Sequence, residues 1–190
     1  MIRIFLLIIL LTFNFSCKEK TSVTEEKSIM EKPKTEAILP EENEIDLKDL
    51  LSKKIPLTGE QLKAAFPREL HGLPLDQEPV IVNRTVSGQF GGSKVRLSIT
   101  DTAGDNYRPA TYFLDTYYKE NFTDTKDTRF IKAERNGLRT FTVHYIGSHS
   151  DMQLLFDDRF HVQIQGEISP DELWLAFDDA VLLPYKDLNP

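Results

Sequence analysis

Three side chains with acid–base chemistry, His71, Asp101 and Asp105, lie in stretches that the sequence predicts to be loops. A histidine with two carboxylates is a minimal set for general acid–base catalysis if folding brings the three groups together. They form no local motif, so only the tertiary structure can assemble them. A small hydrolase or transferase with its site near these residues is therefore one functional hypothesis.

Other catalytic and ligand-binding motifs are incomplete. Residues 101–104 match the D-x-x-G element of GTPases, but the chain has no G-x-x-x-x-G-K-S/T loop to hold phosphates. Asp101, Asp105 and Asn106 carry oxygen ligands that suit Ca²⁺, but their spacing is not that of a calcium-binding loop. Because there is also no H-E-x-x-H or G-x-S-x-G motif, we expect no cofactor and no metal, and we favour a protein that is not an enzyme.

A larger group of side chains favours binding over catalysis. Several segments alternate apolar residues with short, uncharged polar ones, whereas exposed strand faces usually carry more Lys and Glu. We expect the polar positions to form one outer face, with His144 and His161 as cross-strand neighbours. The candidate binding face comprises Asn83, Thr85, Thr142, His144, His161 and Gln163. Its partner would be a protein or a glycan, and the alternative is a plain solvated sheet face, because Thr favours strands anyway.

Two further groups of side chains, a set of tyrosines and a short polar run, are open to more than one interpretation. The tyrosines Tyr107, Tyr112, Tyr117 and Tyr118 are either a second surface patch or part of the packing around a helix. The run Ser148–Asp151 contains the residue types of a catalytic triad, but neighbours in the chain cannot adopt triad geometry. We interpret that run as an ordinary polar loop.

The elements that position these residues follow from periodicity and capping residues. Thr58 with Gln61, and Ser169 with Pro170 and Glu172, are typical helix starts. The apolar spacing over 109–121 predicts another helix. Period-two alternation predicts strands, with turns at the glycines of residues 91–93 and at Asn136-Gly137. The expected strands are 80–90, 94–100, 128–134, 138–146, 152–156 and 160–164.

This order of elements predicts an α+β fold. We expect an antiparallel sheet of about six strands, with two or three helices packed on one face. At this level the chain resembles the small sandwich architecture of the Mog1/PsbP-like proteins. That resemblance is an architectural analogy and implies no activity.

The N-terminus has the pattern of an export signal. Arg3 precedes an apolar run over residues 4–11, which is too short to span a membrane comfortably and is typical of a signal peptide. The alternative is an uncleaved anchor helix. Ser16 and Cys17 follow the run, and charged residues begin at Lys18.

Ser16-Cys17 resembles the lipobox of bacterial lipoproteins, and Lys18-Glu19 resembles the residues after the cysteine in lipoproteins of Bacteroidetes-type bacteria. The resemblance implies that Cys17 is lipidated, for instance with palmitate, and becomes the first residue of the mature chain. It also implies a place in the bacterial cell envelope, at the outer membrane, on its periplasmic or its surface face. Several acyl chains on one cysteine make a stable anchor, where one chain would be marginal.

Composition sets the remaining limits. The chain has 190 residues and a formal net charge of −7, and this negative charge disfavours nucleic acid as a partner. It has a single cysteine, which excludes an intrachain disulfide. Lys18–Glu44 contains 5 Lys, 8 Glu and no aromatic residue, which is typical of a flexible spacer. We therefore expect a signal peptide over 1–16, a lipidated cysteine and charged tether over 17–44, and one domain over 45–190.

The leading functional hypothesis is a lipid-anchored envelope protein with a binding or envelope-maintenance role. The hydrolase or transferase described above is the second hypothesis. An accessory or immunity factor for a secreted system is the third.

Overall fold

The structure is a computed structural model that describes residues 40–118 and 120–188. The predicted signal peptide, Cys17 and most of the predicted tether lie outside the described residues. Within the described residues, no helix is long and apolar enough to cross a membrane.

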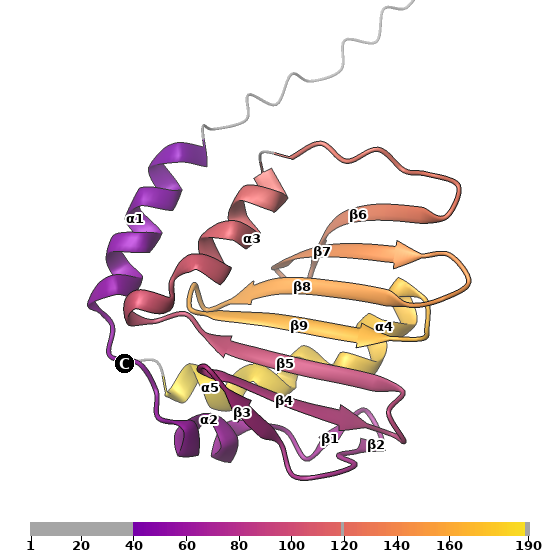
Figure 1. Ribbon diagram of the computed structural model, residues 1–190, viewed down its shortest axis with the longest axis horizontal. Coiled ribbons are helices and arrows are strands. Elements are labelled where there is room, and N and C mark those ends of the chain that lie inside the picture. The colour runs from indigo at the N-terminus through magenta and orange to yellow at the C-terminus, as the bar shows by residue number, and fades with distance from the viewer. Residues whose placement is uncertain (1–39, 119, 189–190) are drawn as a thin grey trace, which may run out of the picture. The chain divides into compact units, whose positions relative to one another are not determined.

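The described chain forms an α+β domain around a seven-stranded sheet (Figure 1). This confirms the predicted fold class. The helices are α1 (Pro40–Lys53), α2 (Gly59–Ala65), α3 (Arg108–Tyr118), α4 (Pro170–Phe177) and α5 (Leu183–Asp187), with short 3₁₀ turns η1 (Gly104–Asn106) and η2 (Asp179–Leu182). The strands of the sheet are β3 (Val80–Val82), β4 (Thr85–Phe90), β5 (Val95–Asp101), β6 (Thr128–Arg135), β7 (Leu138–Tyr145), β8 (Ser150–Phe156) and β9 (Phe160–Gly166), while β1 (Glu69–Leu70) and β2 (Leu73–Pro74) pair separately.

The spatial order of the sheet is β3-β4-β5-β9-β8-β7-β6, and every neighbouring pair is antiparallel. After β5 the chain crosses through α3 to the far edge and returns strand by strand until β9 pairs with β5. The hairpin β4–β5 and the last strand, β9, therefore meet in the middle of the sheet. This pairing places residues far apart in sequence on one surface.

One strand more than expected arises within residues 80–90. The sequence predicts a single strand there, but Asn83 and Arg84 adopt left-handed backbone angles, with φ of 47° and 63°. Two such residues make a tight turn that matches strand twist. The segment therefore folds back on itself as the hairpin β3–β4, with Val82 opposite Thr85.

Helices cover both faces of the sheet, which corrects the expectation of helices on one face only. Leu173 and Phe177 of α4 belong to the main core with residues of α2 and α5, on the face to which Val86, Ile99 and Val162 point. Helix α3 packs on the opposite face, where the rings of Phe113 and His161 lie 6.2 Å apart. Helix α1 packs on α3 through a second buried cluster containing Leu47, Leu51 and Ala110.

Both predicted helix starts are confirmed as capping boxes. The Thr58 hydroxyl accepts from the Gln61 amide at 3.3 Å, and Ser169 is paired with Glu172 in the same way. Reciprocal bonds of this kind satisfy amides that the first helical turn leaves unpaired. Helix α1 begins at Pro40, so regular structure starts within the segment predicted to be tether.

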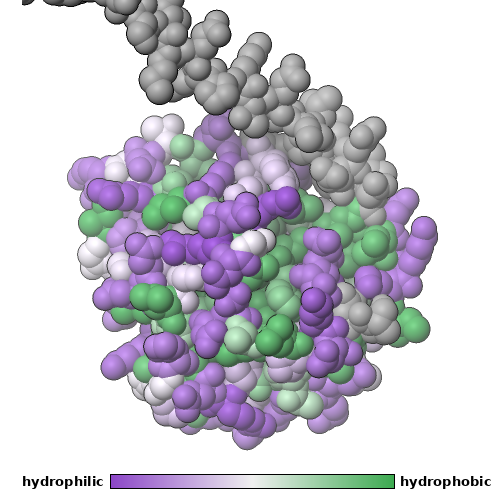
Figure 2. Space-filling view, turned by 180° about the vertical axis from the view of Figure 1, so that it is seen from behind, coloured by the Kyte–Doolittle hydropathy of each residue, from purple (hydrophilic) through white to green (hydrophobic). Residues whose placement is uncertain are grey.

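The side of the molecule opposite to the view of Figure 1 carries mostly hydrophilic side chains, with hydrophobic ones in patches between them (Figure 2).

Candidate functional site

The candidate site lies on the sheet face that α3 covers only in part, which we call the open face. Directly opposed residues in an antiparallel sheet point to the same side, so the register defines this face. Three cross-strand rows run over β4, β5, β9 and β8. The rows are Gln89–Arg96–Gln165–Asp151, Ser87–Ser98–Gln163–Gln153 and Thr85–Thr100–His161–Leu155.

Hydrogen bonds between side chains order this surface. Within the rows, the Thr85 and Thr100 hydroxyls lie 2.8 Å apart and the Ser87 and Ser98 hydroxyls lie 2.9 Å apart. Between rows, the Gln163 amide donates to both oxygens of Asp151, at 2.8 and 3.1 Å. The floor is therefore held in place by its own polar contacts, while Gln89, Arg96 and Gln165 point outward.

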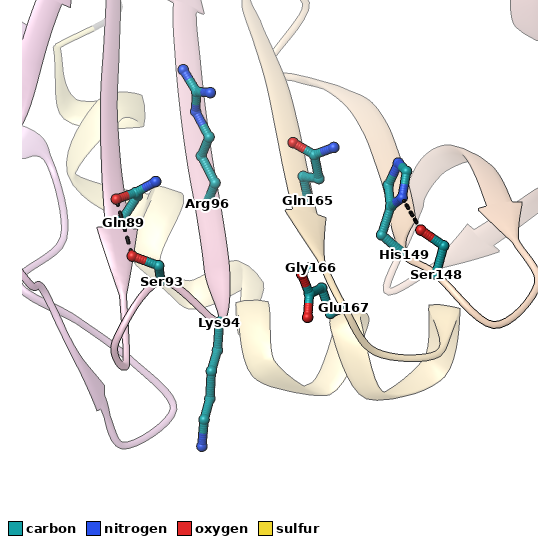
Figure 3. Close-up of a pocket in the computed structure, with 9 residues that line it drawn as sticks. All are labelled: Gln89, Ser93, Lys94, Arg96, Ser148, His149, Gln165, Gly166 and Glu167. Atoms are coloured by element: carbon teal, nitrogen blue, oxygen red, sulfur yellow. Dashed lines mark hydrogen bonds between the residues drawn. The ribbon is translucent and has the colours of Figure 1, made fainter.

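The open face is hollowed in three adjoining places. The largest hollow, about 530 Å³, lies over β3, β4, β5 and β9, where Val80 and Val82 form one wall. A hollow of about 290 Å³ lies towards β8 (Figure 3), and one of about 240 Å³ lies beside residues 76–78. Arg96 lines all three, so the hollows adjoin at this residue, and we call the three together the groove.

Arg96 is exposed, and its guanidinium makes no direct contact with a carboxylate of the described residues. Among the described residues, no ion pair or hydrogen bond involves its guanidinium. The nearby carboxylates are already engaged: Asp76 accepts from the amides of Gly92 and Ser93, at 2.7 and 2.6 Å. Glu78 pairs with the side chains of Arg68 and Lys63.

Four of the six residues in the predicted binding face lie together. Thr85, His161 and Gln163 belong to the rows of the open face, and these residues with Asn83 line the largest hollow.

The placement of Thr142 and His144 on that face is wrong. Thr142 lies opposite Met152 and is buried in the direction of α4. His144 lies opposite Ser150, with its Nδ1 3.0 Å from the Ser150 hydroxyl, which in turn donates to the Ile168 carbonyl before α4. His144 and His161 are consequently on opposite faces and are not cross-strand neighbours.

Thr142 and His144 point to the other face because the open face has an apolar part at β7, which the aromatic residues of that strand occupy. Phe141 points to the open side and packs with Phe122 and Phe130, at ring distances of 5.0 and 6.5 Å. Strand β7 therefore carries aromatic residues on the open face and threonines on the face of the main core, opposite to the expected arrangement.

Burial perturbs two titratable groups of the open face. Desolvation beneath α3 lowers the pKa of His161 to about 4, so this imidazole is neutral at pH 7 and its Nε2 lies 3.3 Å from the Gln153 oxygen. Burial raises the pKa of Asp151, while the hydrogen bond from Gln163 partly opposes the shift. Both groups serve as hydrogen-bonding parts of the floor.

The structure does not bring His71, Asp101 and Asp105 together. His71 lies in the turn between β1 and β2. The Gly91 amide in the β4–β5 turn donates to the Pro74 carbonyl of β2, so His71 lies near that end of the sheet. Asp101 lies at the other end of β5. Asp105 is exposed and pairs with Arg84 at 2.8 Å.

Asp101 is instead the centre of a buried structural network. It receives hydrogen bonds from the Arg159 Nε at 2.8 Å and Nη2 at 3.1 Å, from the Leu57 amide at 2.7 Å and from the Ala103 amide at 3.1 Å. These bonds occupy the lone-pair sites of the carboxylate oxygens. This network ties the β8–β9 turn and the α1–α2 connection to the end of β5.

The other candidates contribute little to a site. The described residues contain no group of three or more His, Cys, Asp or Glu side chains that could hold a metal ion. Tyr112 and Tyr118 are exposed on α3, while Tyr107 and Tyr117 are half-buried, and Lys48 lies over the Tyr107 ring at 5.2 Å. Ser148 and His149 contact each other at 2.9 Å and line the hollow of Figure 3.

Sequence reasoning missed Arg96 as a functional residue. It is the charged residue of β5 that points to the open face, where its neighbours on the same strand are Ser98 and Thr100. That contrast is visible in the sequence. Its position at the centre of a groove is not, because the groove depends on the pairing of β5 with the last strand of the chain.

The fold and this surface define an α+β domain with an open, polar, grooved sheet face. No protein-family model, no curated protein and no solved structure matches the chain at a level that shows relationship.

Proposed function

We propose that this chain is a lipid-anchored protein of the bacterial cell envelope whose domain binds a ligand on its open face without transforming it. The observation that supports the binding role is the groove around Arg96, with its ordered floor of neutral hydroxyls and amides. Burying such groups against a ligand is favourable only when their hydrogen bonds are replaced. A hydroxyl-rich or amide-rich partner, a glycan or a protein, meets that condition.

The geometry supports binding more than catalysis. The titratable groups of the groove are distributed along it, and Asp151 is engaged by Gln163 while burial keeps His161 neutral. A general base must reach a bound substrate with a free lone pair at a matched pKa. The earlier hypothesis of a hydrolase or transferase at His71, Asp101 and Asp105 finds no support in their separate positions.

The lipid anchor is the second part of the proposal and rests on the sequence around Cys17 alone. Metabolic labelling with an alkyne analogue of palmitate, followed by membrane fractionation, tests it. The wild-type chain should carry the label and sediment with membranes, at the outer membrane. Cys17→Ser should abolish both, since the chain has no other cysteine. A wild-type protein that is unlabelled and wholly soluble in the periplasm would overturn the anchor.

Binding on the open face is tested with the full chain and a panel of neutral and acidic oligosaccharides immobilised on a surface. Ser98→Tyr places a large side chain on the floor of the groove and should abolish retention of any glycan that binds. Glu134→Tyr adds the same side chain at an exposed position of β6 and should leave retention unchanged. Retention that survives Ser98→Tyr would place binding elsewhere and contradict the proposal.

We also propose that the domain belongs to the Mog1/PsbP-like sandwich architecture. What supports this is an antiparallel sheet between layers of helices (Figure 1). A crystal structure with the same strand order and helix placement as that architecture would uphold it, and a different strand order would overturn it.

A further inference from the structure

The charge pattern of the groove narrows the chemistry of its ligand. We propose that Arg96, flanked by Gln89 and Gln165, recognises the carboxylate of an acidic oligosaccharide. This inference rests on the proposed binding role of the open face and assigns the ligand class.

The first step concerns the arginine itself. Gln89 and Gln165 lie directly opposite Arg96 on the strands to either side, and Figure 3 shows the three side chains following one another across β4, β5 and β9. A guanidinium presents a planar fork that matches a carboxylate with two parallel hydrogen bonds. The described residues place no carboxylate in contact with that fork, so its donors can bond to an incoming carboxylate.

The second step concerns the charge around it. Lys94 also lines the hollow of Figure 3, but its side chain points away from the Arg96 guanidinium, and Glu167 lies on the side of Lys94. The chain as a whole carries a net charge of −7. A densely charged polymer such as a nucleic acid needs several cations in a row. Among the described residues, Arg96 is the cation at the centre of the groove, and the carboxylates of Asp76, Glu78 and Glu167 also line it. This arrangement fits a ligand with one carboxylate at Arg96 and few other charges.

The third step concerns the rest of the ligand. The row next to Arg96 consists of Ser87, Ser98, Gln163 and Gln153, which offer both donors and acceptors to hydroxyl groups. From β3 to β9 the residues that line the groove cross three strand spacings, or roughly 15 Å. That length accommodates an extended chain of small rings rather than a single ion.

The fourth step concerns two borders of the groove that carry apolar or aromatic side chains. Val80 and Val82 are 63% and 61% exposed at the β3 edge. Near the other end, the rings of Tyr145 and His149 stack with their centroids 4.5 Å apart, and His149 lines the hollow. Sugar rings combine apolar C–H faces with polar edges, so these borders and the polar floor match one ligand class.

The experiment is calorimetric titration of the full-length chain with trisaccharides that contain one uronic acid and two neutral sugars. Galacturonate, mannuronate and glucuronate serve in turn as the acidic ring, each with its methyl ester as a control that keeps the hydroxyls and removes the charge. We expect at least one acid to bind, and its ester to bind roughly 10- to 100-fold more weakly, since a charge-assisted bond contributes 1.5–3 kcal/mol.

Three variants assign the effect to Arg96. Arg96→Gln should weaken binding of the acid to about the level of its ester, and it should weaken ester binding much less, because the ester keeps only a neutral carbonyl acceptor. Arg96→Lys should restore only part of the affinity, because an ammonium lacks the fork. Arg129→Gln removes the same charge from an exposed arginine that lies opposite His144, on the other face, and should have no effect.

The outcomes separate this inference from the proposed function. Equal binding of acid and ester, or equal losses for Arg96→Gln and Arg129→Gln, would overturn the inference but leave binding on the open face intact. Failure of every acid to bind would also overturn it, and a neutral glycan or a protein retained on the open face would then keep the broader proposal.

Discussion

Removing the guanidinium of Arg159 tests whether the buried network at Asp101 holds the domain together. Asp101 and Arg159 are 0% and 1% exposed, and Arg159 also donates to the Ile55 carbonyl at 2.9 Å. Arg159→Met retains much of the volume but leaves the Asp101 carboxylate with only the Leu57 and Ala103 amides. Breaking a buried pair by removing one partner costs about 3–5 kcal/mol, because the remaining charge stays desolvated.

That loss is a large part of a domain stability of roughly 5–15 kcal/mol. For a domain of this size it lowers the melting temperature by roughly 6–20 °C. Urea unfolding followed by circular dichroism and calorimetry measure both quantities. Arg68→Met is the matched control: Arg68 pairs with Glu78 at 2.8 Å on the surface, so its loss should cost below about 1 kcal/mol.

The double variant Asp101→Asn with Arg159→Met sharpens the test. The Leu57 and Ala103 amides bond to different oxygens of Asp101, so the single oxygen of Asn can accept from only one of them. Because no buried charge remains, the double variant should still be more stable than Arg159→Met alone. If Arg159→Met costs no more than Arg68→Met, or if the double variant is the least stable of all, the interpretation of Asp101 as a structural anchor is wrong.

Three further predictions concern single residues. Gly88→Ala should destabilise the domain by about 1–3 kcal/mol in urea unfolding, because the added Cβ would lie 2.7 Å from the side chains of Phe66 and Leu75; unchanged stability would show that these side chains yield freely. Tyr185→Phe removes a buried hydroxyl that donates to the Leu62 carbonyl at 3.0 Å and should cost about 1–2 kcal/mol. The folded-state pKa of His161 is about 4, below its ordinary 6.5, so this residue lowers stability as pH falls from 6.5 to 4, by at most roughly 3 kcal/mol. The free energies of unfolding of wild type and His161→Gln, plotted against pH, should therefore converge or cross between pH 6.5 and 4. Parallel plots would contradict the lowered pKa of His161.

Local signals in the sequence predict most of the fold. The capping boxes at Thr58 and Ser169 and the Asn136-Gly137 turn are confirmed because each is decided by a few neighbouring residues. The hairpin at Asn83-Arg84 was not predicted, since neither residue is glycine and the flanking valines continue a period-two pattern.

The faces of the strands are harder to predict. Strand β7 alternates Thr with Phe141 and Val143, and the pattern alone assigns the larger apolar residues to the main core. A period of two is symmetric between faces, so the assignment depends on the partner strand and on what covers each side. Here Thr140 pairs with Leu154 in the core, while Phe141 packs with Phe122 on the open side.

In the candidate site too, local sequence predicts some features, and others depend on strand pairing. The neutral polar character of Thr85, His161 and Gln163 was predicted from composition. The role of Arg96 depends on the pairing of β5 with β9, which are joined only by the long return through β6, β7 and β8.

Chemical-shift mapping of the isotope-labelled full-length chain, titrated with whichever uronic acid trisaccharide binds most tightly, tests the central claim most directly. The account predicts shifts centred on the amides of β4, β5 and β9 and on the Arg96 and Gln165 side chains, with smaller shifts at the borders around Val80, Val82 and His149. Shifts centred on α4 and α5, on the opposite face, would contradict it.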